Sequence, residues 1–372
     1  MMNESILSKI QTPCVVIDMD KAKKNIKEMQ DAANEAGCKL RPHIKTHKMQ
    51  RFAKMQVEQG ACGVTCAKVS EAEVMADGGI HDIFIAYPLV GEFRIQRAIA
   101  LKARVKRLIL AVDSIDCARI LSQVAIENNL VFEVRLEVDT GAKRTGVLRE
   151  DAAKLAQLIS KLEGLQLTGI YTFKSLVYKD KPTKDKNIAA VEEGEMMKQI
   201  AQSIRATGVE LEDISAGSSP TGVGVAQTGM VDEIRPGTYI FNDYMLVCEG
   251  VCEVEDIAVR MYATVVSTPC DEYAVIDGGT KTFPMDIMLN QEPYFYKGYA
   301  LVANNDDLRL TRMNEEHGIL TSVKGKTELK VGQKLELIPI HVCTAINMQN
   351  EVYIYENEDV TLQKVDARGM LV

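Results

Sequence analysis

The order of hydrophobic and polar residues divides the chain into two parts with different patterns. From about Pro13 to Tyr239, short apolar runs alternate with amphipathic stretches of helical period. Strands are predicted at Cys14–Asp20, Lys39–Lys45, Gly63–Lys68, Asp82–Pro88, Arg107–Val112, Phe132–Asp139, Leu167–Phe173 and Glu212–Gly217. Helices are predicted, for example, at Lys21–Ala36, Ser70–Asp77, Ser114–Asn128, Arg149–Leu162 and Asn187–Ala206.

About eight strand–helix units in roughly 225 residues is the rhythm of an α/β protein with a (β/α)8 barrel of the TIM type. An open parallel sheet is the alternative, because the pattern does not show whether the sheet closes. After about Met245 the pattern changes to alternating, β-branched runs separated by Gly and Asp turns. The sequence therefore predicts a barrel domain at 13–245 and a mainly β domain at 246–372, with which residues 1–12 could pack.

Composition narrows the classes of function. The 372 residues include 44 Lys and Arg against 52 Asp and Glu, which gives a formal net charge of −8. This acidic balance argues against nucleic acid as a partner, and no apolar run approaches the roughly 20 residues of a membrane-spanning helix. The first residues lack the basic start and apolar core of an export signal, so we expect a cytoplasmic protein that acts on small molecules.

A lysine stands at the end of the second predicted strand, in the segment RPHIKTHK. His43 and Lys45 are two positions apart, so they share one face of a strand. In a barrel, functional groups lie where strands end and loops begin. An ammonium group there is costly to desolvate unless it is neutralised or used covalently, as in Schiff-base chemistry. A solvated basic rim is the alternative interpretation.

Two later segments rich in small residues favour the covalent interpretation. The loop DISAGSSPT (Asp213–Thr221) follows the last predicted barrel strand, where backbone N–H groups and hydroxyls commonly hold phosphate. The segment EIRPGTY (Glu233–Tyr239) adds a second Gly-containing turn and an arginine. Gly and Ser turns occur in every fold, and neither segment is a nucleotide-binding fingerprint. Together with Lys45, they favour pyridoxal phosphate as the cofactor.

A candidate metal site stands near the end of the chain, in the segment PIHVC. His341 and Cys343 are two positions apart, which on a strand points both side chains to one face. Imidazole plus thiolate suits Zn²⁺ better than Mg²⁺ or Ca²⁺, and two protein ligands leave room for water and a substrate oxygen. Ordinary packing in a β domain is the alternative interpretation of this pair.

Nine segments, taken in order, resemble the pattern of the D-threonine aldolase / D-serine dehydratase family, whose members are fold-type III, alanine-racemase-like enzymes. They are TPCVVIDMDKAKKNI, RPHIKTHK, QGACGVTCAKVSEAEVMADGGIHDIFIAYPLVG, DTGAKRTGV, AGSSPTG, EIRPGTYIFND, AVIDGGTKTF, NEEHG and PIHVCTAIN. They span nearly the whole chain, and RPHIKTHK combined with a late His-x-Cys is highly specific. The resemblance implies a pyridoxal-phosphate barrel followed by a β domain, working as a homodimer.

The resemblance also implies roles for individual residues. Lys45 is identified as the lysine that binds the cofactor covalently and acts as the base at Cα. The other implied cofactor-binding residues are Arg144, Tyr171, Arg235 and, around the phosphate, Ser218, Ser219, Gly237 and Thr238. His341 and Cys343 are implied as ligands of a divalent metal, zinc with manganese as the alternative. The family's dehydratases tend to carry His-x-Cys here and its aldolases His-x-Asp, so the cysteine favours a dehydratase.

One segment departs from the family pattern. Where the family usually has Tyr-x-Gly-His, this chain has Tyr-Thr-Phe-Lys at 171–174. The change adds bulk and an amine near the cofactor, which could alter the substrate or the reaction. We expect Lys174 to turn to solvent. If it instead faced the cofactor opposite Lys45, two bases on two faces of Cα would permit racemisation.

The sequence therefore predicts a pyridoxal-phosphate-dependent lyase that acts on a β-hydroxy D-amino acid, as a dehydratase or an aldolase. A divalent metal would polarise the β-hydroxyl group, and a homodimer without nucleic-acid or membrane partners is expected. The first alternative is a racemase or epimerase that uses Lys45 and a second base, either Lys174 or a partner-chain tyrosine such as Tyr294 or Tyr296. The second alternative is a pyridoxal-phosphate-binding protein without catalytic activity.

Overall fold

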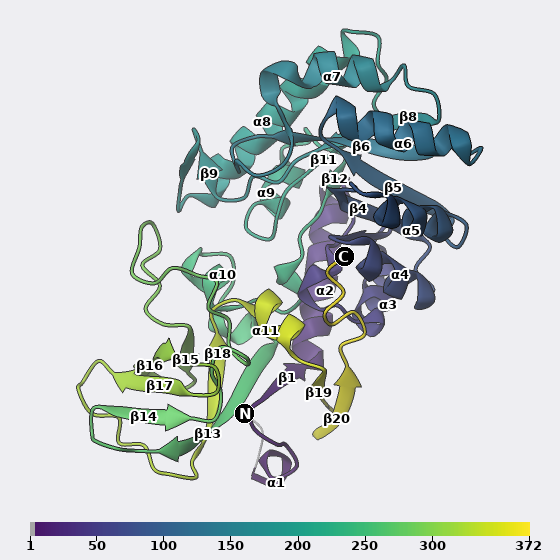
Figure 1. The fold of residues 1–372 in the computed structure, drawn as a ribbon. Helices are drawn as coiled ribbons and strands as arrows, with labels where there is room; N and C mark the ends of the chain where they lie inside the picture. The colour runs from purple at the N-terminus through teal and green to yellow at the C-terminus, as the bar shows by residue number, and fades with distance from the viewer. Residues whose placement is uncertain (1–3) are drawn as a thin grey trace. The chain divides into compact units, whose positions relative to one another are not determined.

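The computed structural model describes residues 4–372, in which contacts along the chain define two compact units (Figure 1). Unit 1 comprises the described residues up to Ile26, together with Thr46–Lys48 and Thr238–Gly369. Unit 2 comprises Lys27–Lys45, Met49–Gly237 and Met370–Val372. Each unit therefore draws on more than one segment of the sequence.

Unit 2 contains a parallel barrel. Within residues 4–372 its strands follow the order β2-β12-β11-β8-β6-β5-β4-β3, and a parallel bridge between His43 and Thr65 joins the segment after β2 to β3. The row of eight strands therefore closes on itself, which confirms the predicted (β/α)8 barrel and excludes the open sheet. The bounds are β2 (Lys39–Leu40), β3 (Val64–Cys66), β4 (Asp82–Pro88), β5 (Arg107–Val112), β6 (Phe132–Asp139), β8 (Leu165–Tyr171), β11 (Asp213–Ala216) and β12 (Glu233–Ile234). Short strands outside the row are β7 (Val147–Leu148), which pairs with β6, and the hairpin of β9 (Val177–Tyr178) and β10 (Lys181–Pro182).

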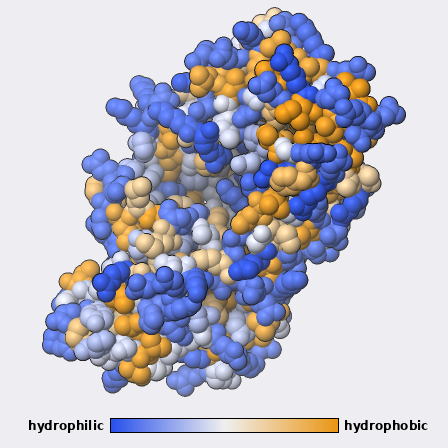
Figure 2. Space-filling model, viewed as in Figure 1, coloured by the Kyte–Doolittle hydropathy of each residue, from blue (hydrophilic) through white to orange (hydrophobic). Residues whose placement is uncertain are grey.

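Helices alternate with the barrel strands, as the helical periods predict. They are α2 (Met19–Glu35), α3 (Gln50–Gln59), α4 (Val69–Asp77), α5 (Glu92–Lys102), α6 (Ile115–Glu127), η2 (Arg149–Asp151), α7 (Ala152–Ile159), α8 (Lys186–Arg205) and α9 (Gly222–Gln227). Ser114 caps α6 and Asp185 caps α8 by accepting backbone N–H groups of the first turn. Figure 2 shows hydrophilic side chains over much of the visible face, with hydrophobic ones gathered in places over the unit 2 helices. Among residues 4–372, no helix is both long and apolar enough to cross a membrane.

Unit 1 is built on a mainly antiparallel sheet with the order β14-β17-β16-β15-β18-β13-β1-β19-β20, in which β14 also pairs with β13. Its strands are β1 (Cys14–Asp18), β13 (Val259–Ser267), β14 (Tyr273–Ile276), β15 (Ala300–Val302), β16 (Asn305–Met313), β17 (Gly318–Ser322), β18 (Lys334–Pro339), β19 (Glu351–Glu356) and β20 (Asp359–Lys364). Its helices are α1 (Glu4–Leu7), η3 (Thr238–Ile240), α10 (Tyr244–Cys248), η4 (Val254–Asp256) and α11 (Val342–Met348). The predicted change from βα units to a β-rich part is therefore present.

The expectation that the first predicted strand belongs to the barrel is wrong. β1 pairs antiparallel with β13 and parallel with β19, both from the far end of the sequence. Its residues are nearly all buried, so its apolar run resembles that of a barrel strand. The missing barrel strand is β12, which has only two residues and begins with the charged Glu233. A strand so short and so polar gives almost no periodic signal.

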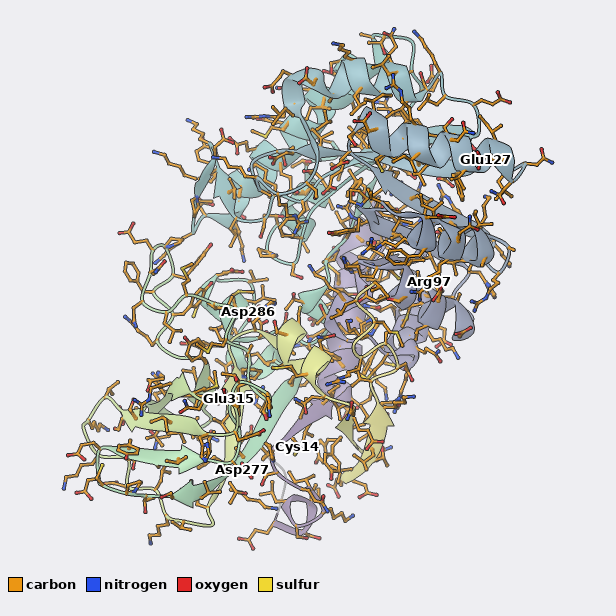
Figure 3. All side chains as sticks on the ribbon, viewed as in Figure 1. Cys14, Arg97, Glu127, Asp277, Asp286 and Glu315 are labelled. Atoms are coloured by element: carbon orange, nitrogen blue, oxygen red, sulfur yellow. The ribbon has the colours of Figure 1, made fainter. Side chains whose placement is uncertain are left out.

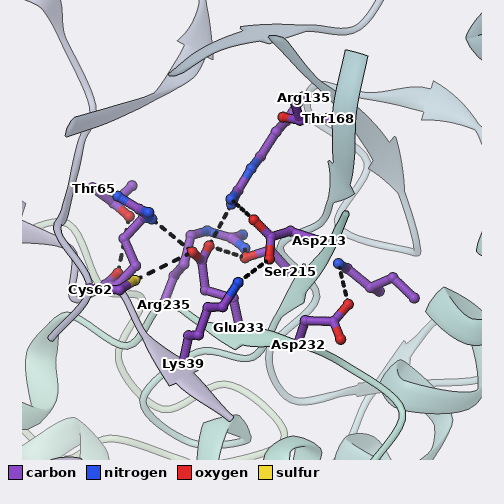
Figure 4. Close-up of polar contacts among 12 residues, drawn as sticks. Lys39, Cys62, Thr65, Arg135, Thr168, Asp213, Ser215, Asp232, Glu233 and Arg235 are labelled. Atoms are coloured by element: carbon purple, nitrogen blue, oxygen red, sulfur yellow. Dashed lines mark hydrogen bonds and ion pairs between the residues drawn. The ribbon is translucent and has the colours of Figure 1, made fainter. Parts of the chain in front are cut away.

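Charged side chains fill the end of the barrel where the strands begin (Figure 4). Glu233 accepts hydrogen bonds from Arg41 Nε at 2.7 Å, Arg135 Nη1 at 2.6 Å and Ser215 Oγ at 2.7 Å. Arg135 also donates to Asp213 at 2.6 Å. Burial alone would raise the pKa of Glu233, but the two guanidinium groups lower it well below the ordinary value of 4.5. The buried charges are therefore paired, as a low-dielectric interior requires.

Replacing this central carboxylate should destabilise the barrel. We expect Glu233→Gln to lower the free energy of unfolding by about 3 kcal/mol at neutral pH, near the low end for a broken buried ion pair, because each arginine keeps a second carboxylate. The folded-state pKa is depressed, so this stability is present above the unfolded pKa near 4.5 and is lost as pH falls below it. Urea unfolding at several pH values measures the difference. The exposed Glu150→Gln is the control, and an equal loss at pH 7 and pH 3 would contradict the ion-pair account.

Candidate active site

Lys45 lies beyond the carboxyl end of β2, in the short turn η1 (Ile44–Thr46). Its backbone N–H donates to His43 Nδ1 at 3.3 Å, and its Nζ lies 5.8 Å from the centre of the Phe173 ring. Among residues 4–372, Lys45 Nζ has no hydrogen-bond or ion-pair partner. The amine therefore stands at the end of the barrel where this fold places reactive groups, with its nitrogen unengaged.

Arg144 faces the same aromatic ring. It lies in the loop after β6, and its Cζ is 4.2 Å from the centre of the Phe173 ring. Within the part of the chain that the structure describes, its guanidinium has no hydrogen-bond or ion-pair partner. Phe173 itself is the second residue after β8. Two cations and one aromatic ring therefore gather at the carboxyl ends of three barrel strands, an arrangement suited to an anionic ligand.

Arg235 and Tyr171 contact each other inside the barrel. Arg235 donates to Ser215 Oγ and to the carbonyl oxygen of Thr172, and its Cζ lies 5.1 Å from the centre of the Tyr171 ring. The Tyr171 hydroxyl donates to Glu137 Oε2 at 2.9 Å. Burial raises the pKa of Tyr171 and lowers the pKa of Arg235. Tyr171 is therefore a neutral phenol at pH 7, and Ser215 links Arg235 to the charge network around Glu233.

Ser218 and Ser219 are buried in the loop that follows β11. Glu193 of α8 holds this loop: Oε1 accepts the Gly217 N–H at 3.0 Å, and Oε2 accepts the Thr221 hydroxyl at 2.9 Å. Thr221 Oγ1 in turn accepts the Ser218 N–H at 3.2 Å. Gly217 has a φ of 84°, and a Cβ there would lie 2.9 Å from neighbouring backbone, so the loop needs glycine. The two serines are thus presented on a tightly fixed turn.

The prediction that Lys174 turns to solvent is wrong. Its side chain is buried, with Nζ donating to the Val177 carbonyl and lying 2.7 Å from Glu192 Oε2. Glu192 also accepts the backbone N–H of Lys179 at 3.1 Å. The ion pair offsets the cost of burying the ammonium group. Lys174 therefore holds the β9–β10 hairpin, and its position offers no support for a second base.

The predicted metal ligands lie in unit 1, but not on a strand. β18 ends at Pro339, and Cys343 lies in the first turn of α11. The helix begins where the Asp243 carboxylate accepts the Val342 N–H at 2.9 Å. The argument from strand spacing is therefore wrong. The two side chains nevertheless interact, because the Cys343 thiol is among the hydrogen-bonding partners of His341.

Further groups surround this His–Cys pair. His341 Nδ1 lies 2.7 Å from Oδ2 of Asp286, which stands on the connection between β14 and β15 (Figure 3). Cys343 Sγ lies 3.2 Å from Thr46 Oγ1 and 3.6 Å from Thr238 Oγ1. Burial opposes protonation, but the charges of Cys343 and Asp286 raise the pKa of His341 to about 11. Thr238, expected at the phosphate, thus contacts the cysteine sulfur.

Comparison with known proteins identifies the family. The model described as "Alanine racemase, N-terminal domain" matches residues 17–245, and a serine dehydratase domain model matches residues 258–355. The chain belongs to the alanine-racemase-like family of D-threonine aldolases and D-serine dehydratases. As a member of this family it is an enzyme, a pyridoxal-phosphate-dependent lyase.

Relatives in this family carry out related reactions. The D-threo-3-hydroxyaspartate dehydratase of Delftia sp. (strain HT23) is 32% identical over 360 residues, which cover 92% of this chain and 93% of that enzyme. The D-threonine aldolase of Arthrobacter sp is 27% identical, over 98% of this chain and 94% of that enzyme. A solved structure of a D-threo-3-hydroxyaspartate dehydratase variant, with a cysteine replaced by alanine and in a metal-free form, has a TM-score of 0.87 at 29% identity. It covers 96% of this chain and 98% of that one.

The residues of unit 2 fit pyridoxal phosphate. An unengaged lysine amine and an arginine with unused donors stand at the barrel mouth, and a glycine-dependent turn presents two buried serine residues. Gly237 follows β12, next to Pro236, whose carbonyl accepts the His43 N–H at 2.9 Å. The lysine amine suits the aldehyde of the cofactor, the arginine its phenolic oxygen, and the turn with the two serine residues its phosphate.

The donor set in unit 1 fits a zinc-type metal in part. Imidazole and thiolate are suitable ligands, and the contact of Asp286 with Nδ1 is the usual second contact of a metal-binding histidine. Among residues 4–372, no group of three or more His, Cys, Asp or Glu side chains is arranged to hold a metal. A metal here would therefore need ligands besides these two side chains, such as water or substrate.

Sequence reasoning missed the acidic residues that organise the site. Glu193 is fully buried, and burial raises the pKa of its carboxyl group. A signal for it exists: Glu193 stands on the buried face of α8, with Ala189, Ala190 and Met197 one turn away. A charge at the centre of an apolar helical stripe indicates a specific buried partner. Glu137, which holds the Tyr171 hydroxyl, gives no such signal, because its strand is polar at alternate positions.

Proposed function

We propose that the enzyme eliminates water from, or cleaves, a β-hydroxy D-amino acid, with dehydration as the favoured course. The observation that carries the proposal is the unengaged amine of Lys45 beside Arg144 at the barrel mouth, in a chain of this family. The relatives named for D-threo-3-hydroxyaspartate dehydration and D-threonine cleavage support the substrate class. Cys343, as opposed to an aspartate at this position, favours dehydration.

The residues of the chain have distinct parts in this reaction. Pyridoxal phosphate, when bound, supplies a conjugated ring that accepts the electron pair left at the substrate Cα. Lys45 would hold the cofactor covalently, and its amine, when free, would take the proton from the substrate Cα. Arg144 orients the substrate carboxylate and the phenolic oxygen with its unused donors. Arg235, which Ser215 and Thr172 hold in place, would bind at the ring nitrogen of the cofactor.

His341 and Cys343 would hold the divalent metal, with zinc preferred over manganese for this donor set. The metal, when bound, is a Lewis acid that makes a substrate hydroxyl easier to remove. Asp286 fixes the imidazole by its contact with Nδ1, as carboxylates do for metal-binding histidines. A structure of the dehydratase relative described as a metal-free form supports metal binding among the relatives.

We also propose that the enzyme works as a homodimer. On the connection between β14 and β15, Met285, Met288 and Phe295 are 53%, 71% and 42% exposed. Three large apolar side chains exposed on one segment are typical of a protein interface. Closed homodimers are the commonest assemblies of soluble proteins, and a second copy of this chain is the occupant that we propose.

A single assay separates the proposed function from its alternatives. Purified enzyme is incubated with D-serine, D-threonine and 3-hydroxy-D-aspartate, and keto acid, aldehyde and inverted amino acid are scored separately. We expect keto acid with an equal amount of ammonium from at least one substrate. Aldehyde would indicate an aldolase. Inversion alone would indicate a racemase, and cofactor absorbance without turnover would indicate a binding protein; either result would contradict the proposal.

A further inference from the structure

The Phe173 ring contacts both cations of the barrel mouth, Lys45 and Arg144. The centre of its ring lies 5.8 Å from Lys45 Nζ and 4.2 Å from Arg144 Cζ. It is the second residue after β8 and is half-buried. The ring therefore approaches the amine from the carboxyl end of β8, which is separated from β2 by β12 and β11, at the face where this fold places its active sites.

The residues on both sides of Phe173 are fixed. Thr172 is fully buried; its hydroxyl donates to the Val138 carbonyl at 2.8 Å, and its own carbonyl accepts from Arg235. Lys174 is buried in the ion pair with Glu192. The backbone at Phe173 is thus held on each flank by buried polar contacts. A side chain placed in this way acts as a rigid wall, because its position does not depend on a flexible loop.

The wall is within reach of the substrate. A group bonded to Lys45 Nζ extends about 1.5 Å beyond the nitrogen, and apolar groups are in contact when their heavy atoms approach within about 4.0–4.5 Å. The ring therefore lies close enough to contact whatever is attached at this amine. It offers no hydrogen bond, so it can favour or exclude a substituent only by size and polarity.

We propose that Phe173 is a specificity-determining residue that limits the size of the group on the substrate Cβ. The wild-type enzyme then takes β-hydroxy D-amino acids whose Cβ carries hydrogen or a methyl group in preference to those that carry an aryl group. This inference rests on the proposed function, because it assumes that the substrate is handled at Lys45.

The test compares D-serine with D-β-phenylserine in the wild-type enzyme, Phe173→Leu and Phe173→Ala. We expect the ratio of kcat/KM for D-β-phenylserine over D-serine to rise at least about tenfold in Phe173→Ala, and less in Phe173→Leu. The reason is that removing the ring enlarges the space for the group on Cβ by the volume of several methylene groups. A second readout is independent of turnover. The affinity for D-phenylalanine relative to that for D-alanine, measured by titration of the cofactor absorbance, should also rise in the two Phe173 variants.

Phe93→Ala is the matched control. Phe93 is 53% exposed on α5 and contacts the guanidinium of Arg94 at 4.5 Å, so it loses a similar aromatic–arginine contact outside the site. A ratio that stays within about twofold of wild type in both Phe173 variants would overturn the inference alone. If Phe173→Ala fails to fold, Phe173→Leu decides by the same criterion. No turnover of any β-hydroxy D-amino acid by the wild-type enzyme would overturn the proposed function, and this inference with it.

Discussion

Lys45→Ala should abolish covalent cofactor binding and lower the lyase activity by at least about 10³-fold. The variant loses both the attachment point and the group that takes the Cα proton, and proton transfer by a positioned side chain alone contributes typically 10²–10⁴-fold. Reduction with borohydride followed by peptide mapping should place the cofactor label on Lys45 of the wild-type enzyme. The variant should give no labelled peptide.

The exposed Lys54 on α3 supplies the control. Lys54→Ala should keep the label and the activity of the wild-type enzyme, which excludes a general effect of removing one positive charge. The assignment of Lys45 does not survive if the label maps to another lysine. It fails equally if Lys45→Ala retains the absorbance of the bound cofactor and its turnover.

Removing the metal should lower dehydration by about 10²–10³-fold, because Lewis-acid assistance at a hydroxyl is worth several kcal/mol. Treatment with a chelator should produce this loss, and added Zn²⁺ should reverse it. His341→Ala and Cys343→Ala should show the same loss without chelator, and elemental analysis should find less metal per chain. Cofactor absorbance should be unchanged, because the cofactor is held by other residues.

Two further variants sharpen this test. Asp286→Asn should weaken metal affinity by about 10–100-fold, the usual effect of changing the group that orients a metal-binding histidine. The exposed Cys270→Ala should match the wild-type enzyme in metal content and rate. Turnover that is insensitive to chelator would remove the metal role assigned to His341 and Cys343.

The fold was predictable from the sequence where strands are long and apolar. The apolar runs 83–85 of β4 and 108–112 of β5 are buried on both faces, so their composition alone identifies strands of a covered parallel sheet. The same property misled at β1, which is equally buried but pairs with β13. Pairing partners are a long-range property, and a two-residue strand such as β12 leaves no periodic trace in the sequence.

The site was predictable only where a residue type and its position at a strand end indicate chemistry. Lys45 and the small residues after β11 satisfy both conditions. The burial of Lys174 was not predictable, because its ion-pair partner Glu192 lies on a different element, α8. A charge that is neutralised by a residue of a different element has the same local sequence as one that faces solvent.

β1 lies between β13 and β19 in the sheet of unit 1, so it pairs with strands that are synthesised much later. β1 is synthesised before the barrel strands, yet its two neighbours are synthesised only after them. Contacts of such large sequence separation form slowly. The barrel strands can therefore pair while β1 is still unpaired, and an unpaired apolar strand is prone to aggregation.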